Sequence, residues 1–164
     1  MELIPYNQMS NEAAEDLADR LDELLAEFQI YRQNVRMVYW NGELRSYLGF
    51  NDKVELLYQL TEDNREAIAE EIISLGYTPT AHHPHSPHDL VPRQVTLLRE
   101  VTDFDSAIFG IVRSSRELLK IVREIFHLAG EYAAEPARQL LRELMVQLML
   151  TIRVLSHERL ALNN

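Results

Sequence analysis

The sequence predicts an all-α protein that folds as an antiparallel bundle of four helices. Three observations support this class. Apolar residues recur with helical period in four long segments. The 164 residues include only five glycines, and turn-forming residues gather between those segments. Hydrophobic residues make up 46% of the chain, enough for one core, so we expect a single domain over residues 1–164.

The first helix is predicted from about Asn11 to Asn41. Ser10 or Asn11 can cap it, and Glu12 and Glu15 lie where the positive end of the helix dipole favours acidic groups. Apolar residues alternate spacings of four and three, which places them on one face that we expect to be buried. They are Leu17, Leu21, Leu24, Phe28, Tyr31, Val35 and Val38.

The second helix is predicted from about Asn51 to Leu75. Gly76 follows directly and can adopt the left-handed conformation that ends a helix, and Pro79 reinforces the stop. Its expected buried face consists of Leu57, Leu60, Ile68, Ile72 and Leu75.

A long crossover separates the second and third helices. Residues 78–91 hold three prolines and four histidines and are predicted to be a loop. A short extra helix is predicted from Pro92, as its first residue, to about Arg99. One long crossover among four helices is the ferritin-like arrangement.

The third and fourth helices are predicted over about 103–130 and 135–160. The link between them is only a few residues long, so they should be antiparallel neighbours. Thr102 or Asp103 can cap the third helix, and Ser115 interrupts its apolar stripe. That stripe comprises Ile108, Val112, Leu119, Val122 and Phe126. The core face of the fourth comprises Ala137, Leu141, Leu144, Leu148, Ile152 and Leu155.

Composition and charge exclude several classes of function. A net charge of −10 repels phosphate backbones, and neither end carries a Lys/Arg-rich tail, which disfavours direct DNA binding. The chain has no cysteine, which excludes disulfides and thiolate metal sites. Gly-rich phosphate loops and the Gly-x-Ser-x-Gly context of serine hydrolases are both absent. Because we find no signal peptide and no membrane span, we expect a cytoplasmic protein.

An acidic stripe on the second helix is the first candidate metal site. Glu55, Glu62, Glu66 and Glu70 are spaced by seven, four and four residues and therefore project from one side. Like charges four residues apart destabilise a helix by a few tenths of a kcal/mol per pair, and a divalent cation would relieve that repulsion. Carboxylates are hard ligands that suit iron, manganese, magnesium or calcium. The alternative is a stripe that simply faces water.

A second candidate lies in the crossover. His82, His83, His85 and His88 form the densest group of nitrogen ligands in the chain, and such a tract can bind zinc, nickel or copper. The alternative is a solvated loop whose histidines bind nothing.

Residues 24–76 contain two distinctive stretches, LLAEFQIYRQNVRMVYWNGELRSYLGFNDKVELLYQL and EAIAEEIISLGYTP. They resemble the first two helices of the DNA-protection-during-starvation (Dps) family, the mini-ferritins. Members of that family carry His-Trp-Asn, then Phe-x-x-Leu-Tyr, and end the second helix near Leu-Gly-Gly-Thr-Pro. The residues in register with that pattern here are Trp40, Asn41, Leu57 and Tyr58.

The resemblance implies a homo-oligomeric shell of twelve subunits that oxidises and stores iron and protects against oxidative stress. Family iron sites lie between two subunits and use two histidines and three carboxylates. Here Tyr39 and Asn51 stand at the histidine positions, whereas Glu55, Glu66 and Glu70 fill the carboxylate positions.

The resemblance therefore implies an iron site made from Glu55 of one chain and Glu66 and Glu70 of its partner, with Tyr39, Asn51 and Glu62 as further candidate ligands. Trp40 is a candidate redox-active aromatic residue, by analogy with the family. The loss of both imidazoles leaves ferroxidase activity open. The alternative is a non-catalytic ferritin-like protein with a structural or interaction role.

Overall fold

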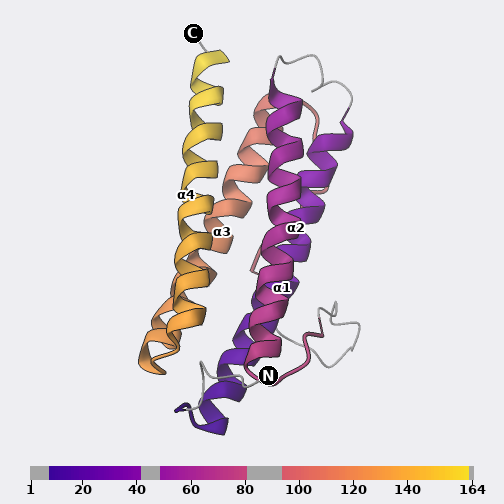
Figure 1. The fold of residues 1–164 in the computed structure, drawn as a ribbon. Coiled ribbons are helices and arrows are strands. Elements are labelled where there is room, and N and C mark those ends of the chain that lie inside the picture. Colours follow the sequence, from indigo (N-terminus) through magenta and orange to yellow (C-terminus); the bar gives the residue numbers. More distant parts are fainter. Residues whose placement is uncertain (1–7, 42–48, 81–93, 163–164) are drawn as a thin grey trace.

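A computed structural model of the chain describes residues 8–41, 49–80 and 94–162. It contains four long helices and, within those ranges, no strand. The helices are α1 (Asn11–Trp40), α2 (Phe50–Ser74), α3 (Phe104–Glu131) and α4 (Glu135–Leu162). They form the expected elongated four-helix bundle (Figure 1), and their bounds agree with the predicted ones within two residues.

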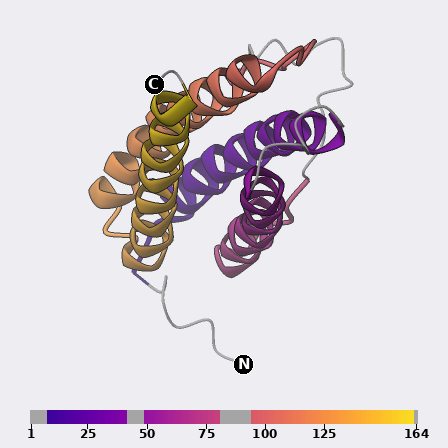
Figure 2. The ribbon, with the colours of Figure 1, turned by 90° about the horizontal axis from the view of Figure 1, so that it is seen from above.

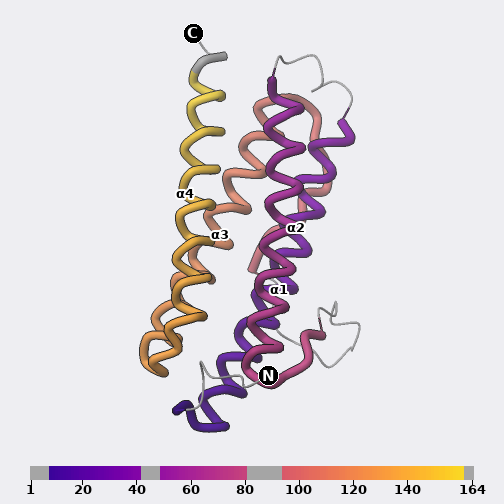
Figure 3. The backbone as a smooth tube through the Cα atoms, in the orientation of Figure 1, coloured from indigo at the N-terminus to yellow at the C-terminus, as the bar shows by residue number. Residues whose placement is uncertain are grey.

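The helices pair as α1 with α2 and α3 with α4, and α1 also packs against α3. Seen from above, α1 lies between α2 and the α3–α4 pair (Figure 2). Residues 94–103 run along the bundle to the start of α3, and α2 and α3 run in the same direction (Figure 3). This is the topology expected for one long crossover.

The core confirms most of the predicted buried faces. Every residue predicted for the face of α1 is at most 1% exposed. On α2, Ile68, Ile72 and Leu75 are buried, whereas Leu57 and Leu60 are only partly buried. Helix α2 packs mainly on α1 and has few contacts with α4. The stripes of α3 and α4 are buried except for Phe126 and Ile152, which are partly buried.

Ser115 interrupts the apolar stripe of α3 because it has a partner in the core. Its side chain is fully buried, lies 2.9 Å from the hydroxyl of Tyr31 and donates to the Ile111 carbonyl oxygen at 2.8 Å. This pair gives the buried tyrosine hydroxyl a hydrogen bond, which an apolar residue at position 115 could not provide.

The short extra helix predicted over 92–99 is wrong for the part of the chain that the structure describes, residues 94–99, which are not helical. Their backbone N–H groups bond to side chains instead of to carbonyls of their own segment. Gln94 and Val95 donate to the two carboxylate oxygens of Glu27 at 2.8 Å each, and Thr96 donates to Glu117 at 2.8 Å. Pro at the first position of a helix is a statistical preference, and these acceptors override it.

Asn34 completes the attachment of the crossover to the bundle. It is fully buried on α1. Its amide oxygen accepts from the Leu98 N–H at 2.8 Å, and its amide nitrogen donates to the Thr96 carbonyl and the Ser114 hydroxyl, also at 2.8 Å. One side chain therefore joins α1, the crossover and α3.

The helix ends confirm the predicted caps. Ser10 accepts from the Ala13 N–H, and Asp103 forms a capping box with Ser106. Gly76 follows the last turn of α2 with a φ of 95°, the left-handed conformation expected of its stop signal.

Replacing Asn34 by Leu should destabilise the protein by about 2–3 kcal/mol, because the buried Leu98 N–H and Thr96 carbonyl lose their partners. Urea denaturation followed by circular dichroism measures the change. Gln33→Leu changes an exposed neighbour on the same helix and should stay within about 0.5 kcal/mol of wild type. Equal losses in the two variants would contradict the role given to Asn34.

Burial raises the pKa of Tyr31 to about 12, and the hydrogen bond with Ser115 only partly opposes this. The protonated hydroxyl is favoured in the folded protein, so its contribution to stability is complete below pH 10 and is lost as the pH rises towards 12. The loss should reach about 2–3 kcal/mol. Urea titrations at a series of alkaline pH values should show it, and Tyr31→Phe should remove it.

Tyr77→Phe is the matched control, because it removes a tyrosine hydroxyl elsewhere and leaves that of Tyr31 in place. It should keep the alkaline loss of stability. A Tyr31→Phe protein that loses stability over the same pH range as the wild type would show that another group is responsible.

Candidate functional site

The surface where the end of α1 faces the start of α2 carries a hollow of about 280 Å³. On each helix the second and third lining residues follow the first by three and four positions, so they share one face. We call it the α1–α2 hollow, and its lining consists of Arg36, Tyr39, Trp40, Glu55, Tyr58 and Gln59. It brings together three residues predicted for the metal site or its surroundings, namely Tyr39, Trp40 and Glu55.

Arg36 is the residue that the sequence prediction missed. Its guanidinium carbon lies 4.6 Å from the centroid of the Trp40 ring and 5.8 Å from that of Tyr58. Both distances fall within the range of cation–π contact. The spacing of four between Arg36 and Trp40 could have revealed the first contact, whereas the contact with Tyr58 depends on how α2 packs on α1.

A second arginine orders the neighbouring part of this surface. Arg32 donates to the Tyr58 hydroxyl at 2.7 Å, and its guanidinium carbon lies 5.3 Å from the centroid of the same ring. Arg32 also pairs with Glu62, which Arg65 contacts at 3.1 Å. Glu62 was predicted as a further candidate ligand, and here it is held between two arginines.

The three carboxylates of the predicted iron site do not meet within one chain. Glu55, Glu66 and Glu70 are all exposed, and none forms an ion pair with another described residue. Eleven residues of helix separate Glu55 from Glu66, which is about 17 Å, and Glu70 is about 23 Å away. In agreement, residues 8–41, 49–80 and 94–162 contain no group of three or more His, Asp or Glu side chains placed to hold a metal ion.

The other residues predicted for a metal site or its surroundings lie in different parts of the chain. Asn51 lies in the first turn of α2, one turn before Glu55, and is partly buried. Trp40 is 58% exposed, so its ring is accessible at the mouth of the hollow. His82, His83, His85 and His88 lie outside the described residues, and the site predicted for them stays a prediction.

The chemistry of the α1–α2 hollow combines oxygen donors with a fixed positive charge. The Glu55 carboxylate and the Tyr39 hydroxyl are hard donors that suit iron and similar cations. The guanidinium of Arg36 places a positive charge in the same hollow, which opposes cation binding. One chain therefore brings two oxygen donors and an opposing charge into the hollow.

The comparisons with known proteins agree with this architecture. No protein-family model matches the chain. A Haemophilus influenzae protein described only as uncharacterized is 30% identical over 116 residues, which cover 70% of each chain. The Dps protein of Vibrio cholerae O1, described as a member of a broad superfamily of ferritin-like diiron-carboxylate proteins, superposes with a TM-score of 0.79. It is 25% identical, over 91% of this chain and 92% of that one.

Two further structures share the fold at lower identity. A Dps protein from Bacillus brevis has a TM-score of 0.78 and 18% identity, over 91% of this chain and 98% of that one. An archaeal Dps homologue from Halobacterium salinarum has a TM-score of 0.74 and 21% identity, over 92% and 83%.

These likenesses place the chain among the ferritin-like four-helix proteins. Its structural neighbours in that superfamily include Dps proteins, the mini-ferritins, which the residues around Trp40 and Tyr58 also resemble. Within the described part of the chain, none of the helices has the length and the apolar character needed to cross a membrane.

Arg36→Gln should make the only tryptophan of the chain easier to quench with acrylamide, because the guanidinium no longer covers the Trp40 ring. Tryptophan fluorescence against acrylamide concentration gives the quenching constant. Arg20→Gln is the matched control, since Arg20 lies on the same helix, paired with Glu23 and away from Trp40. Equal quenching in Arg36→Gln and Arg20→Gln would contradict the stacking described above.

Proposed function

We propose that this protein is a mini-ferritin that binds ferrous iron between two copies of the chain and stores the oxidised metal in an oligomeric shell, thereby protecting the cell against oxidative stress. The observation that carries the proposal is the placement of Glu55 beside Tyr39 in the α1–α2 hollow, with Glu66 and Glu70 exposed further along the same helix. In this proposal one chain supplies half of the site, and a second copy supplies the other half.

The ligands of the proposed site are oxygen atoms. Glu55 of one copy would bind iron together with Glu66 and Glu70 of a second copy, and Tyr39 and Asn51 can add a hydroxyl and an amide oxygen. Antiparallel α2 helices of two copies would bring the start of one helix opposite the end of the other. Iron is the substrate in this proposal. The exposed carboxylates of Glu55, Glu66 and Glu70 support its capture, because their negative charge attracts the cation.

The reaction is the oxidation of two ferrous ions, each of which loses one electron. Hydrogen peroxide takes up both electrons with two protons and becomes two molecules of water. The carboxylates would hold the ferrous ions and would bind the ferric product more tightly, because it carries the higher charge. Trp40, exposed at the mouth of the hollow, could donate an electron to a stray oxidant.

A second function is favoured by one observation, the guanidinium of Arg36 in the hollow. It supplies a positive charge where the family binds a metal, and Tyr39 and Asn51 replace the nitrogen ligands. A carboxylate of a second copy could then pair with Arg36, and no metal would be needed. In that case the protein is a non-catalytic ferritin-like protein with a structural or interaction role.

The two functions are separated by stopped-flow measurement of ferrous oxidation with peroxide and with oxygen. The triple variant Glu55→Ala, Glu66→Ala, Glu70→Ala should lose about 100-fold or more in rate, because all its carboxylate ligands are gone. The matched control is Asp63→Ala, which removes an exposed carboxylate of α2 and should retain the wild-type rate. Wild-type and triple-variant rates that both equal the protein-free background would leave the non-catalytic function.

The proposed shell is a large assembly, and light scattering measures its mass directly. Twelve chains of 19.1 kDa would weigh about 230 kDa. The triple carboxylate variant should keep that mass if the interface is held by packing, and should lose it if metal holds the copies together. A wild-type monomer or dimer would leave the stored iron without a container and would contradict the shell.

A further inference from the structure

A second hollow lies on the opposite half of the bundle, between the first half of α3 and the last turns of α4. Its volume is about 380 Å³, within the range of small-molecule sites. We call it the α3–α4 groove. Ile108 and Val112 of α3 form its floor and are almost fully buried, and Leu160 of α4 lies at its mouth, 63% exposed. The exposed apolar side chains of the lining are those of Phe109 and Leu160, and these would gain from being covered.

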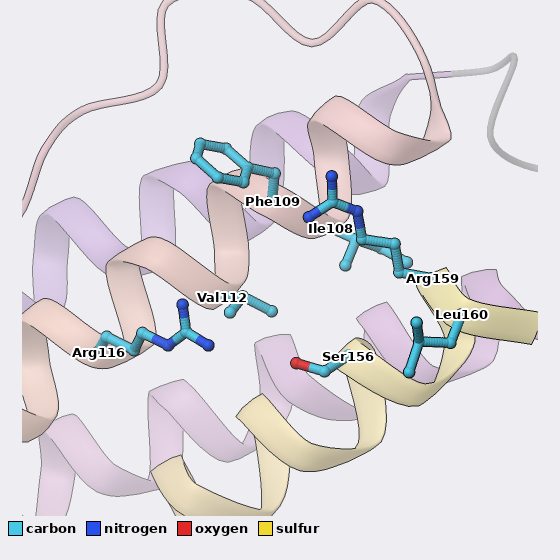
Figure 4. Close-up of a pocket in the computed structure, with 7 residues that line it drawn as sticks. All are labelled: Ile108, Phe109, Val112, Arg116, Ser156, Arg159 and Leu160. Atoms are coloured by element: carbon cyan, nitrogen blue, oxygen red, sulfur yellow. The ribbon is translucent and has the colours of Figure 1, made fainter. Parts of the chain in front are cut away.

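Two guanidinium groups stand over this apolar floor. Arg116 and Ser156 point toward each other across Val112, and Arg159 lies nearer Phe109 (Figure 4). Neither Arg116 nor the Ser156 hydroxyl has a hydrogen bond or ion pair with any residue in the described ranges. An unpaired guanidinium and a free hydroxyl that face each other can bind the two oxygens of one carboxylate.

The other charges at the groove leave an excess of positive charge. Arg159 is shared with Asp105, with Nε to Oδ1 at 2.6 Å and Nη2 to Oδ2 at 3.2 Å. Arg113 and Arg159 each have their guanidinium carbon 5.9 Å from the centroid of the Phe109 ring. Asp105 pairs with Arg159 only, which leaves Arg116 without a carboxylate partner among the described residues, so a cation is disfavoured at the groove and an anion is favoured.

The charged residues of the two helix pairs are distributed in the same way. Helices α1 and α2 carry fourteen acidic and five basic residues, whereas α3 and α4 carry seven acidic and eight basic ones. An anion that approaches this acidic protein would be repelled least at the α3–α4 side. The position of the groove on that side is independent of the carboxylate stripe on α2.

We propose that the α3–α4 groove binds a small amphipathic monocarboxylate, such as a medium-chain aliphatic acid. The carboxylate lies between Arg116 and the Ser156 hydroxyl, and the apolar tail runs over Val112 and covers the exposed side chain of Leu160. A phosphate ion would leave the exposed side chain of Leu160 uncovered, and a neutral hydrocarbon would give Arg116 no charged partner. The apolar floor and the charged rim together therefore favour an amphipathic acid.

Isothermal titration calorimetry of the full chain with sodium octanoate tests this directly. We expect saturable binding with a Kd below about 1 mM, near what ten non-hydrogen atoms allow. Acetate lacks the tail and 1-octanol lacks the charge, so both should bind at least about tenfold more weakly. Octanol binding as tightly as octanoate, or no saturable octanoate binding, would overturn the proposal.

Single substitutions test whether octanoate binds in the α3–α4 groove. Arg116→Gln should weaken octanoate binding about tenfold or more, and Ser156→Ala should weaken it by a smaller factor. Arg123→Gln is the matched control, because it removes an exposed arginine two turns further along α3 and should bind as the wild type does. Circular dichroism checks that each variant is folded. Equal weakening by Arg116→Gln and Arg123→Gln would mean that octanoate binds a diffuse positive surface, which would also overturn the proposal.

A second copy of the chain is the other occupant that the groove could take. Leu160→Glu should weaken octanoate binding and leave the mass measured by light scattering unchanged. If it lowers the mass while octanoate gives no heat with the wild type, the groove is a contact between copies and the monocarboxylate site is wrong. The proposal is independent of iron, because none of its variants alters Glu55, Glu66 or Glu70.

Discussion

The bundle depends on side chains of α1 and α3 that hold a non-helical crossover in place. Residues 94–98 cannot satisfy their own backbone groups, so Glu27, Asn34 and Glu117 accept their N–H groups. Leaving such groups unpaired next to the core would cost more than the contacts around them gain. This attachment lets α3 start at the opposite end of the bundle from where α2 stops, and so sets the direction of α3 against α1.

The two antiparallel helix pairs of this bundle differ in the charge of their surfaces. The pair α1 and α2 is strongly acidic and carries the α1–α2 hollow, where Glu55 and Tyr39 lie beside Arg36. The pair α3 and α4 carries a slight excess of basic residues and the α3–α4 groove with Arg116. The proposed roles follow this division, with a cation between copies at the first surface and an anion within one copy at the second.

The positions of the helices and most of the core could be predicted because local periodicity determines them. The face from Leu17 to Val38 is an example, since each residue depends only on its place on one helix. The crossover over 94–99 could not be predicted, because its hydrogen-bond acceptors are far away in the sequence. The acidic residues of α2 were found as a pattern, but their distance from one another along the helix shows that one chain cannot complete a site.

The sequence by itself determined the four helices, their caps, the buried face of each and the motif around Trp40 and Tyr58, because these depend on residues within a few turns of each other. Tertiary structure alone decided the rest. It buried Ser115 against Tyr31, placed Arg36 over two aromatic rings and turned Arg116 towards Ser156. Apart from that of Arg36 with Trp40, one turn apart on α1, these contacts join different helices, and their geometry follows from how the helices pack, which no local pattern contains.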